Sequence, residues 1–189
     1  VKGGETFLSP HVIIATGAGW RRLGLEGEEQ LVGHGVHFCP HCDGPFYKGR
    51  RVAVIGGGNS GVEAAIDLAR ICSHVTLYEF GQAMKADEVL QQKLRSLPNV
   101  DIHLQSQTTA LSSSDGKLTG IDVRNLATGE VAHEELDGVF VQIGLQPNSS
   151  VFKEALELNS RGEIIIDSRN HTSAAGVYAA GDVTTVPFK

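Results

Sequence analysis

Two cysteines separated by two residues are the part of this 189-residue sequence best suited to chemistry. Cys39 and Cys42 stand in the run Cys-Pro-His-Cys, and such a pair can form a small-ring disulfide that opens and closes reversibly. Asp43 follows directly, and a carboxylate beside a dithiol can accept and return a proton as thiol and disulfide interconvert. We therefore expect a redox centre with Cys39, Cys42 and Asp43 as its catalytic residues.

A zinc site is an alternative interpretation of the cysteines. A closed zinc site needs four ligands, and three histidines lie close in sequence, at His34, His37 and His41. However, no second Cys-x-x-Cys appears, and the third cysteine, Cys72, falls at the end of an expected helix, where a buried apolar role is more usual. We therefore favour a redox dithiol over a zinc site and expect no bound metal. The interpretation that the two cysteines are inert thiols ranks last.

The residues after Cys42 limit the local structure. Cys-Pro-His-Cys also occurs in thioredoxin-fold disulfide oxidases, where it starts a long helix, but here Gly44 and Pro45 follow. Both residues oppose helix propagation beyond a turn, so we expect a short turn that presents the two sulfurs. Within it, Asp43 has a second interpretation as a helix cap, and His41 either tunes a neighbouring thiolate or is simply solvated.

A glycine-rich turn begins at Gly56, at the end of a strand pattern that starts nine residues after Cys42. It follows a β-branched strand pattern and opens a helical pattern, which is the context of a dinucleotide cradle rather than of a purely structural glycine turn. Glycines at these spacings permit a tight turn, close approach of backbone to a pyrophosphate, and close helix packing, while the helix N-terminus offers free N–H groups. The cofactor-binding residues expected here are Gly56, Gly58, Asn59, Ser60, Gly61 and Glu63.

Glu79, at the end of the next strand pattern, bears on the choice of nucleotide. A carboxylate there can accept hydrogen bonds from both ribose hydroxyls, whereas a 2′-phosphate would be repelled and would favour arginine. Glu79 therefore indicates NADH. Lys85 is close enough in sequence to keep NADPH as an alternative, and Glu79 could also be only a solvated strand end.

The surrounding pattern predicts an α/β fold. A strand, helix and strand unit of about 28 residues is the size of a βαβ crossover, and a further helix and strand extend a parallel sheet. Turn residues then favour an antiparallel meander, after which a continuous apolar run predicts a central strand. The expected strands are 11–15, 51–55, 75–78, 100–104, three between 108 and 137, 139–143, 164–166 and 177–180; the helices are 60–71 and 87–97; and 18–38 is expected to be loop.

Composition excludes several classes of function. The net charge of −6 and the lack of any long basic run argue against nucleic-acid binding. No apolar run approaches the roughly 18 residues needed to cross a bilayer, and no signal peptide is evident, so we expect a cytoplasmic protein without membrane contact. Because the sequence starts at Val1 without methionine and stops after an apolar run, we interpret it as a fragment.

Several segments together resemble the low-molecular-weight thioredoxin reductase family, and the similarity runs almost end to end. The segments are Cys39 to Gly44, Val52 to Ile66, Phe140 to Asn148 and Gly176 to Asp182. The resemblance implies a Rossmann-like nicotinamide-binding domain, built from a parallel sheet and an antiparallel meander and inserted into a partial FAD-binding domain. The implied divisions are a partial FAD domain at 1–21, the NAD(H) domain with its redox centre at 22–146, and the rest of the partial FAD domain at 147–189.

The resemblance also implies roles outside the dithiol. Electrons would pass from NADH through FAD to the Cys39–Cys42 disulfide, with Cys42 on the flavin side and Cys39 attacking the next disulfide. The branch that the motifs match would pass them to a peroxiredoxin-type peroxidase subunit, through a thioredoxin-like module that this sequence lacks, in a homodimer whose nicotinamide domain rotates. The further implied cofactor-binding residues are Gly144, Thr16, Gly17, Gly181 and Asp182.

Two other functions remain open at this point. One is an NADPH-dependent thioredoxin reductase acting on free thioredoxin, against which Glu79 argues. The other is a nucleotide-binding or redox-sensing module without turnover. Because the family's own N-terminal glycine motif is missing from this sequence, we expect its FAD site to be incomplete.

Overall fold

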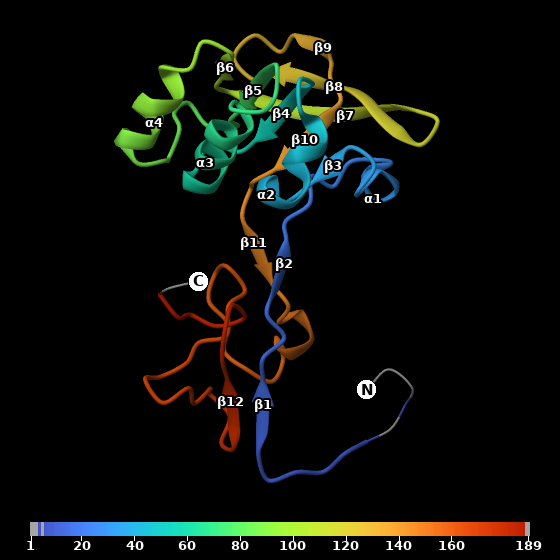
Figure 1. The fold of residues 1–189 in the computed structure, drawn as a ribbon. Coiled ribbons are helices and arrows are strands. Elements are labelled where there is room, and N and C mark those ends of the chain that lie inside the picture. The colour runs from blue at the N-terminus through green and yellow to red at the C-terminus, as the bar shows by residue number, and fades with distance from the viewer. Residues whose placement is uncertain (1–3, 5, 188–189) are drawn as a thin grey trace. The chain divides into compact units, whose positions relative to one another are not determined.

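The computed structural model describes residue 4 and residues 6–187, and it divides the chain into two compact units. The first comprises the residues up to Trp20 and those from Leu145 onward, and the second comprises Arg21–Gly144. Figure 1 shows the chain entering and leaving the second unit through neighbouring segments. The boundaries differ from those expected from the sequence, because Arg21 groups with the central unit, and Leu145 and Gln146 with the flanking one.

A five-stranded parallel sheet forms the middle of the central unit. Its strands follow the order β3, β10, β4, β5, β6, and every neighbouring pair is parallel. Their bounds are β3 Val36–His37, β10 Gly138–Val141, β4 Arg51–Ile55, β5 His74–Tyr78 and β6 Val100–His103. The parallel strands and the central place of the 139–143 run are thus confirmed.

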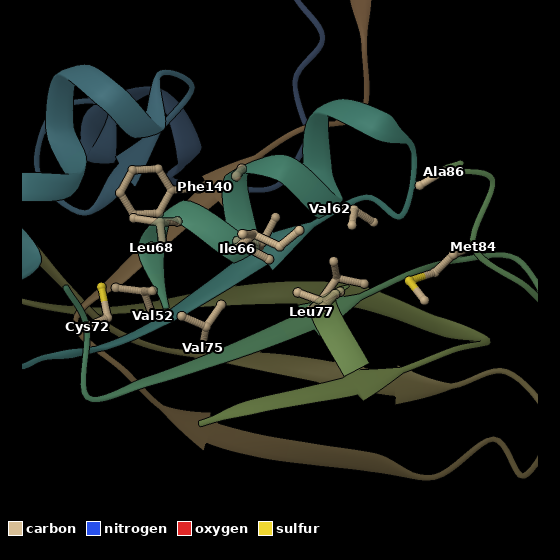
Figure 2. Packing of buried hydrophobic residues seen from close by; sticks show 14 of the residues in the cluster. Val52, Val62, Ile66, Leu68, Cys72, Val75, Leu77, Met84, Ala86 and Phe140 are labelled. Atoms are coloured by element: carbon tan, nitrogen blue, oxygen red, sulfur yellow. The ribbon is translucent and has the colours of Figure 1, made fainter. Parts of the chain in front are cut away.

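Helices cover one face of this sheet. α3 (Asn59–Leu68) follows β4, and α4 (Glu88–Arg95) follows β5. Figure 2 shows side chains of α3 directed toward strand residues of the sheet, and alternate strand residues share this buried cluster because successive side chains of a strand point to opposite faces. The largest side chains of the cluster that are fully buried are Phe140, Leu68, Leu77, Leu94, Val52, Val54, Val62 and Val75.

An antiparallel meander covers the other face. It consists of β7 (Ser106–Ser114), β8 (Lys117–Asn125) and β9 (Val131–Glu135), joined in that order. Glu134 of β9 ties the meander to the sheet by accepting hydrogen bonds from Thr76 Oγ1 at 2.7 Å and Tyr78 OH at 2.5 Å. The predicted combination of parallel sheet and antiparallel meander is therefore confirmed.

The expectation that residues 18–38 form a loop is wrong. They contain β2 (Ala18–Trp20), the short helix α1 (Glu28–Leu31) and β3. The buried carboxylate of Glu28 organises the segment by accepting the backbone N–H groups of Leu23 at 3.0 Å and Gly24 at 2.7 Å. Elements of two to four residues are too short for a hydrophobic period to be recognised, and pairing with distant strands defines them instead.

The flanking unit contains two small sheets. β1 (Val12–Ile14) pairs in parallel with β12 (Val177–Ala179), and β2 pairs antiparallel with β11 (Leu145–Pro147). The expected strand at 164–166 does not form, because Ile164 makes only isolated bridges, to Leu158 and Thr184. Ile164 is nevertheless fully buried, so its apolar character reflects packing and not sheet pairing.

In residue 4 and residues 6–187, no helix is both long enough and apolar enough to cross a bilayer.

Leu77→Ala tests the packing between sheet and helices. Leu77 of β5 is fully buried beneath α3, and truncating a buried leucine leaves a cavity that costs about 2–5 kcal/mol. We expect the free energy of unfolding, measured with urea by far-ultraviolet circular dichroism, to fall by that amount. Val89→Ala is the matched control, because Val89 on α4 is 77% exposed and such surface changes stay within about 0.5 kcal/mol; equal losses in both variants would contradict the described core.

Candidate functional site

The ends of four parallel strands define the candidate site. β3, β10, β4 and β5 run in the same direction, so their carboxyl ends share one edge of the sheet, where ligands of open α/β sheets bind. The segments that leave this edge carry Cys39, the glycine turn at 56–58, Glu79 and residues 142–144. The topology thus gathers most of the chemically interesting residues of the sequence.

A cavity of about 540 Å³ lies at this edge. Six of the predicted cofactor-binding residues line it: Gly56, Gly58, Asn59, Ser60, Glu79 and Gly144. Gly61 lies behind the turn and is buried, and Glu63 is exposed on α3 and does not line the cavity. The remaining lining residues are Leu23, Ile55, Gly57, Tyr78, Phe80, Lys85, Ser106, Gln107, Thr108, Gln142 and Ile143.

At two positions, the close approach of other backbone atoms leaves room only for glycine. Gly56 has φ +119°, and a Cβ there would collide with the carbonyl of Gln142. A Cβ on Gly61 would collide with the carbonyl of Gly56. By contrast, a Cβ on Gly58 would meet nothing within 4 Å, so the backbone beside the start of α3 is open to a ligand. This cradle fits a pyrophosphate held by backbone N–H groups at a helix N-terminus.

The carboxylate of Glu79 is anchored by the backbone around it. One oxygen accepts the N–H of Gly57 at 2.6 Å and the other accepts the N–H of Gly81 at 2.7 Å. Glu79 is therefore not merely a solvated strand end, because it braces the glycine turn. Each carboxylate oxygen has a further lone pair to offer, so the side chain can brace the turn and still accept a ligand hydroxyl.

The two cysteines form a disulfide on a short turn. Cys39 precedes α2 (Pro40–Asp43), which passes directly into the 3-10 turn Gly44–Tyr47, and the N–H of Cys42 donates to Cys39 Sγ at 3.2 Å. The expectation of a short turn presenting both sulfurs is confirmed. Cys39 is half-buried and Cys42 is exposed.

Cys72 is a buried free thiol, as expected. Burial in the apolar cluster raises the pKa of its thiol to about 11. Since the thiolate is the reactive form, Cys72 is chemically quiet beside the pair.

Asp43 caps no helix through its side chain. Its Oδ2 instead lies 3.1 Å from Nδ1 of His37, the last residue of β3, whose Nε2 lies 2.7 Å from the hydroxyl of Tyr47. His37 is only 6% exposed, and burial lowers its pKa while Asp43 partly opposes that shift. Burial likewise raises the pKa of Tyr47. The alternative of Asp43 as a side-chain helix cap is therefore wrong.

Gln142 links the cavity to the dithiol segment. It lines the cavity, and its Nε2 donates to the backbone carbonyl of Phe38 at 2.7 Å, one residue before Cys39. The guanidinium of Arg22 lies 4.6 Å from the centre of the Phe38 ring. Sequence reasoning missed Gln142, although a polar residue directly after an apolar central strand is a signal for a side chain at the sheet edge.

The histidines near the cysteines do not gather into one site. His41 is exposed and lies 3.8 Å from Asp67, whereas His37 faces inward to Asp43 and Tyr47. No cluster of three or more His, Cys, Asp or Glu side chains suited to a metal ion occurs in residue 4 and residues 6–187.

The expected flavin-contacting residues lie at two neighbouring turns of the flanking unit. Thr16 and Gly17 follow β1, and Gly181 and Asp182 come soon after its partner β12. Both glycines have positive φ, +67° and +77°, with open space at the Cβ position. Thr16 also exchanges hydrogen bonds with Asn148, its Oγ1 donating at 2.8 Å and its carbonyl accepting at 2.9 Å.

Comparisons with known proteins agree with this arrangement. Residues 1–188 match the family model described as pyridine nucleotide-disulphide oxidoreductase. The chain is 59% identical over 184 residues to the F subunit of alkyl hydroperoxide reductase from Staphylococcus aureus, and 56% identical over 186 residues to that from Escherichia coli. These alignments cover 97% and 98% of this chain, but only 36% of each relative.

Solved structures of thioredoxin reductases share the fold. The enzyme of T. acidophilum matches with a TM-score of 0.84 and 38% identity, covering 98% of this chain and 61% of that one. The enzyme of Lactococcus lactis matches with a TM-score of 0.86 and 32% identity, covering 99% and 62%. The resemblance to thioredoxin reductases noted in the sequence is thus confirmed, and the chain belongs to the pyridine nucleotide-disulphide oxidoreductase family.

Proposed function

We propose that the complete protein carrying this chain is an NADH-dependent flavoprotein disulfide reductase. It would pass electrons from NADH through FAD to the Cys39–Cys42 disulfide, and onward to a peroxiredoxin-type peroxidase subunit. The observation that carries the proposal is the single sheet edge that holds both the nucleotide cradle and the disulfide. Because the chain spans about a third of the length of the relatives it matches, we assign the activity to the whole protein.

The cradle residues would bind the nucleotide through backbone groups. The turn at 56–58 and the first residues of α3 offer N–H groups to the pyrophosphate, and Gly56 and Gly61 let the backbone pack closely beneath it. Glu79, fixed by Gly57 and Gly81, would accept the ribose hydroxyls. Its negative charge disfavours a 2′-phosphate at the same place.

The dithiol residues would move two electrons and a proton. When bound, FAD supplies the two-electron chemistry between the nicotinamide and the disulfide. The Cys39 thiolate would attack the disulfide of the partner, and Cys42 would then attack Cys39 to restore the intramolecular bond. Asp43 would take the proton that the Cys42 thiol releases and return it when the disulfide is next reduced.

The flanking unit would hold part of the flavin. Its turns at Thr16–Gly17 and Gly181–Asp182 would contact FAD, with Asp182 toward the ribityl chain. Within its described residues this unit contains no α-helix preceded by a glycine turn, so the flavin pyrophosphate needs groups beyond those residues. The proposal places the transfer to the peroxidase on a thioredoxin-like module, in a protein that functions as a homodimer.

Reduction of free thioredoxin with NADPH is the second candidate. Its support is the similarity to solved thioredoxin reductases and the position of Lys85 at the cavity. The two candidates differ in nucleotide and in acceptor, so one set of assays separates them.

The direct test is whether thiols appear in the complete protein when NADH is added in the absence of oxygen. We expect one equivalent of NADH to convert the Cys39–Cys42 disulfide into two thiols, identified by alkylation and mass spectrometry. Cys42→Ser has no disulfide at this position, so NADH should bleach the flavin without producing the two thiols, and Cys72→Ala should behave as wild type. NADH oxidation that never opens the Cys39–Cys42 disulfide would overturn the proposal, and turnover with free thioredoxin but not with a peroxiredoxin would favour the second candidate.

Glu79→Gln tests the nucleotide preference. Removing the negative charge relieves repulsion of a 2′-phosphate worth about 1–2 kcal/mol, so the ratio of kcat/KM for NADH over NADPH should fall about five- to thirtyfold. The measurement is steady-state oxidation of both nucleotides by the complete protein. Glu88→Gln, an exposed change on α4 outside the cavity, should leave the ratio unchanged, and a wild-type preference for NADPH would refute the role of Glu79.

A further inference from the structure

A buried histidine stands behind the carboxylate of the redox centre. The ring of His37 stacks on Phe140 at 5.4 Å with an interplanar angle of 28°, and meets Tyr47 edge-on at 5.2 Å. Tyr47 also packs edge-on against Phe140 at 5.6 Å. These aromatic contacts hold the imidazole in place, and both of its nitrogens have polar partners.

The hydrogen bonds of this cluster have only one consistent direction when Asp43 is ionised. A carboxylate only accepts, so Nδ1 of His37 must carry the hydrogen that bonds Asp43 Oδ2. In a neutral imidazole Nε2 then accepts, so the hydroxyl of Tyr47 is the donor at 2.7 Å. Burial, which lowers the pKa of His37, keeps the imidazole neutral near pH 7.

Few other charged groups act on this cluster. His34, which is exposed on the segment before β3, acts in the same direction as burial and lowers the pKa of His37. On the Tyr47 side lie Arg50 and Asp137, which pair with each other at 3.1 Å, and the buried thiol of Cys72. Since Arg50 and Asp137 neutralise each other, Asp43 is the charge to which His37 responds most directly.

We infer that His37 is a positioning residue for the dithiol. Its Nδ1–H holds one carboxylate oxygen of Asp43 and leaves the other oxygen to exchange a proton with the thiol of Cys42. The hydroxyl of Tyr47 fixes the tautomer that makes this possible. The inference rests on the proposed function of Asp43, and it explains why a polar histidine occupies a strand position that is buried between sheet and turn.

The step that His37 would assist is closure of the disulfide. The Cys39 thiolate attacks an external disulfide, which releases one thiolate of that reagent and leaves a mixed disulfide. The Cys42 thiol then gives its proton to Asp43, and its sulfur attacks Cys39, so that the Cys39–Cys42 bond forms and the second reagent thiolate leaves. The dithiol loses two electrons and the reagent gains two.

The test compares two amides in place of the imidazole. In His37→Asn the side-chain N–H₂ occupies the place of Nδ1 and still donates to Asp43, whereas in His37→Gln it occupies the place of Nε2 and serves only Tyr47. The 189-residue chain, chemically reduced in a Cys72→Ala background, reacts with 4,4′-dithiodipyridine in a stopped-flow instrument. The rate of ring closure is followed as release of the second equivalent of thiopyridone.

The expected order of ring-closure rates among the variants separates a positioning role of His37 from a purely structural one. Loss of general acid–base help in Asp43→Asn should slow closure about a hundredfold, and misplacement of the carboxylate in His37→Gln about tenfold. His37→Asn should remain within about threefold of wild type, although it leaves the larger void. In the Asp43→Asn background, His37→Gln should have less than about a twofold further effect, because the two residues act through one another.

Several outcomes would overturn the inference. Equal slowing by Asn and Gln, or an undiminished effect of His37→Gln in the Asp43→Asn background, would show that His37 only supports the fold. Far-ultraviolet circular dichroism and the melting temperature check that each variant folds. If His37→Gln does not fold, Tyr47→Phe replaces it. Tyr47→Phe should slow ring closure less than His37→Gln would, and this slowing must be absent when Asp43→Asn is also present. His133→Asn, which removes an exposed imidazole paired with Asp122 at 2.7 Å, is the control and should leave closure unchanged.

The assay is independent of nucleotide and flavin. If NADH fails to open the disulfide in the complete protein but closure follows the expected order, the proposed function fails and the role of His37 stands. If NADH opens the disulfide and the order is absent, only the role of His37 fails.

Discussion

The arrangement of this protein depends on the pairing of β10 with two strands at once. Val139 pairs with Val36 of β3 on one side and with Ala53 of β4 on the other, and Phe140 pairs likewise with His37 and Val54. Because all three strands are parallel, this register sets the dithiol segment and the glycine turn at the same edge of one sheet. The dithiol segment and the glycine turn therefore inherit their positions from the backbone hydrogen bonds of β10, whose side chains are fully buried.

Carboxylates hold the less regular segments to that sheet. Glu79 braces the glycine turn, Glu134 fastens the meander through Thr76 and Tyr78, and Glu28 organises the chain before α1. In each case fixed backbone or hydroxyl donors satisfy a carboxylate that is partly or fully removed from solvent, which avoids the cost of an unpaired buried charge. Asp43 follows the same rule with His37 as its partner. The redox centre is thus built with the same device that stabilises the rest of the central unit.

The sequence was sufficient to predict a helix or strand where the pattern of residues was local and long enough to repeat. β4 spans the predicted 51–55, α3 and α4 largely coincide with the predicted helices, and the meander follows its turn residues, because these elements are defined by their own periodicity. β3 has two residues and exists only through its pairing with β10, about a hundred positions later in the chain. No local window contains that information.

The site was predictable to a similar degree. The glycine turn and Glu79 follow from spacing, since a dinucleotide cradle imposes fixed offsets. The contact of His37 with Asp43 and Tyr47 does not, because it depends on how the turn after β3 folds back over Phe140. The link from Gln142 to Phe38 joins residues 104 positions apart. Such contacts arise from tertiary packing, for which the type of residue is the only sequence signal.

One compact unit carries both the nucleotide cradle and the dithiol, and the proposed function requires that NADH binds to that unit. This is measured by titrating the isotope-labelled chain with NADH and following its backbone amides by nuclear magnetic resonance. We expect saturable shifts at residues 56–60, at Glu79 and Gly81, and at residues 142–144, with smaller shifts at Cys39 transmitted through Gln142. Shifts confined to the unit that contains β1 and β12, or no saturable shifts at any NADH concentration, would contradict this assignment.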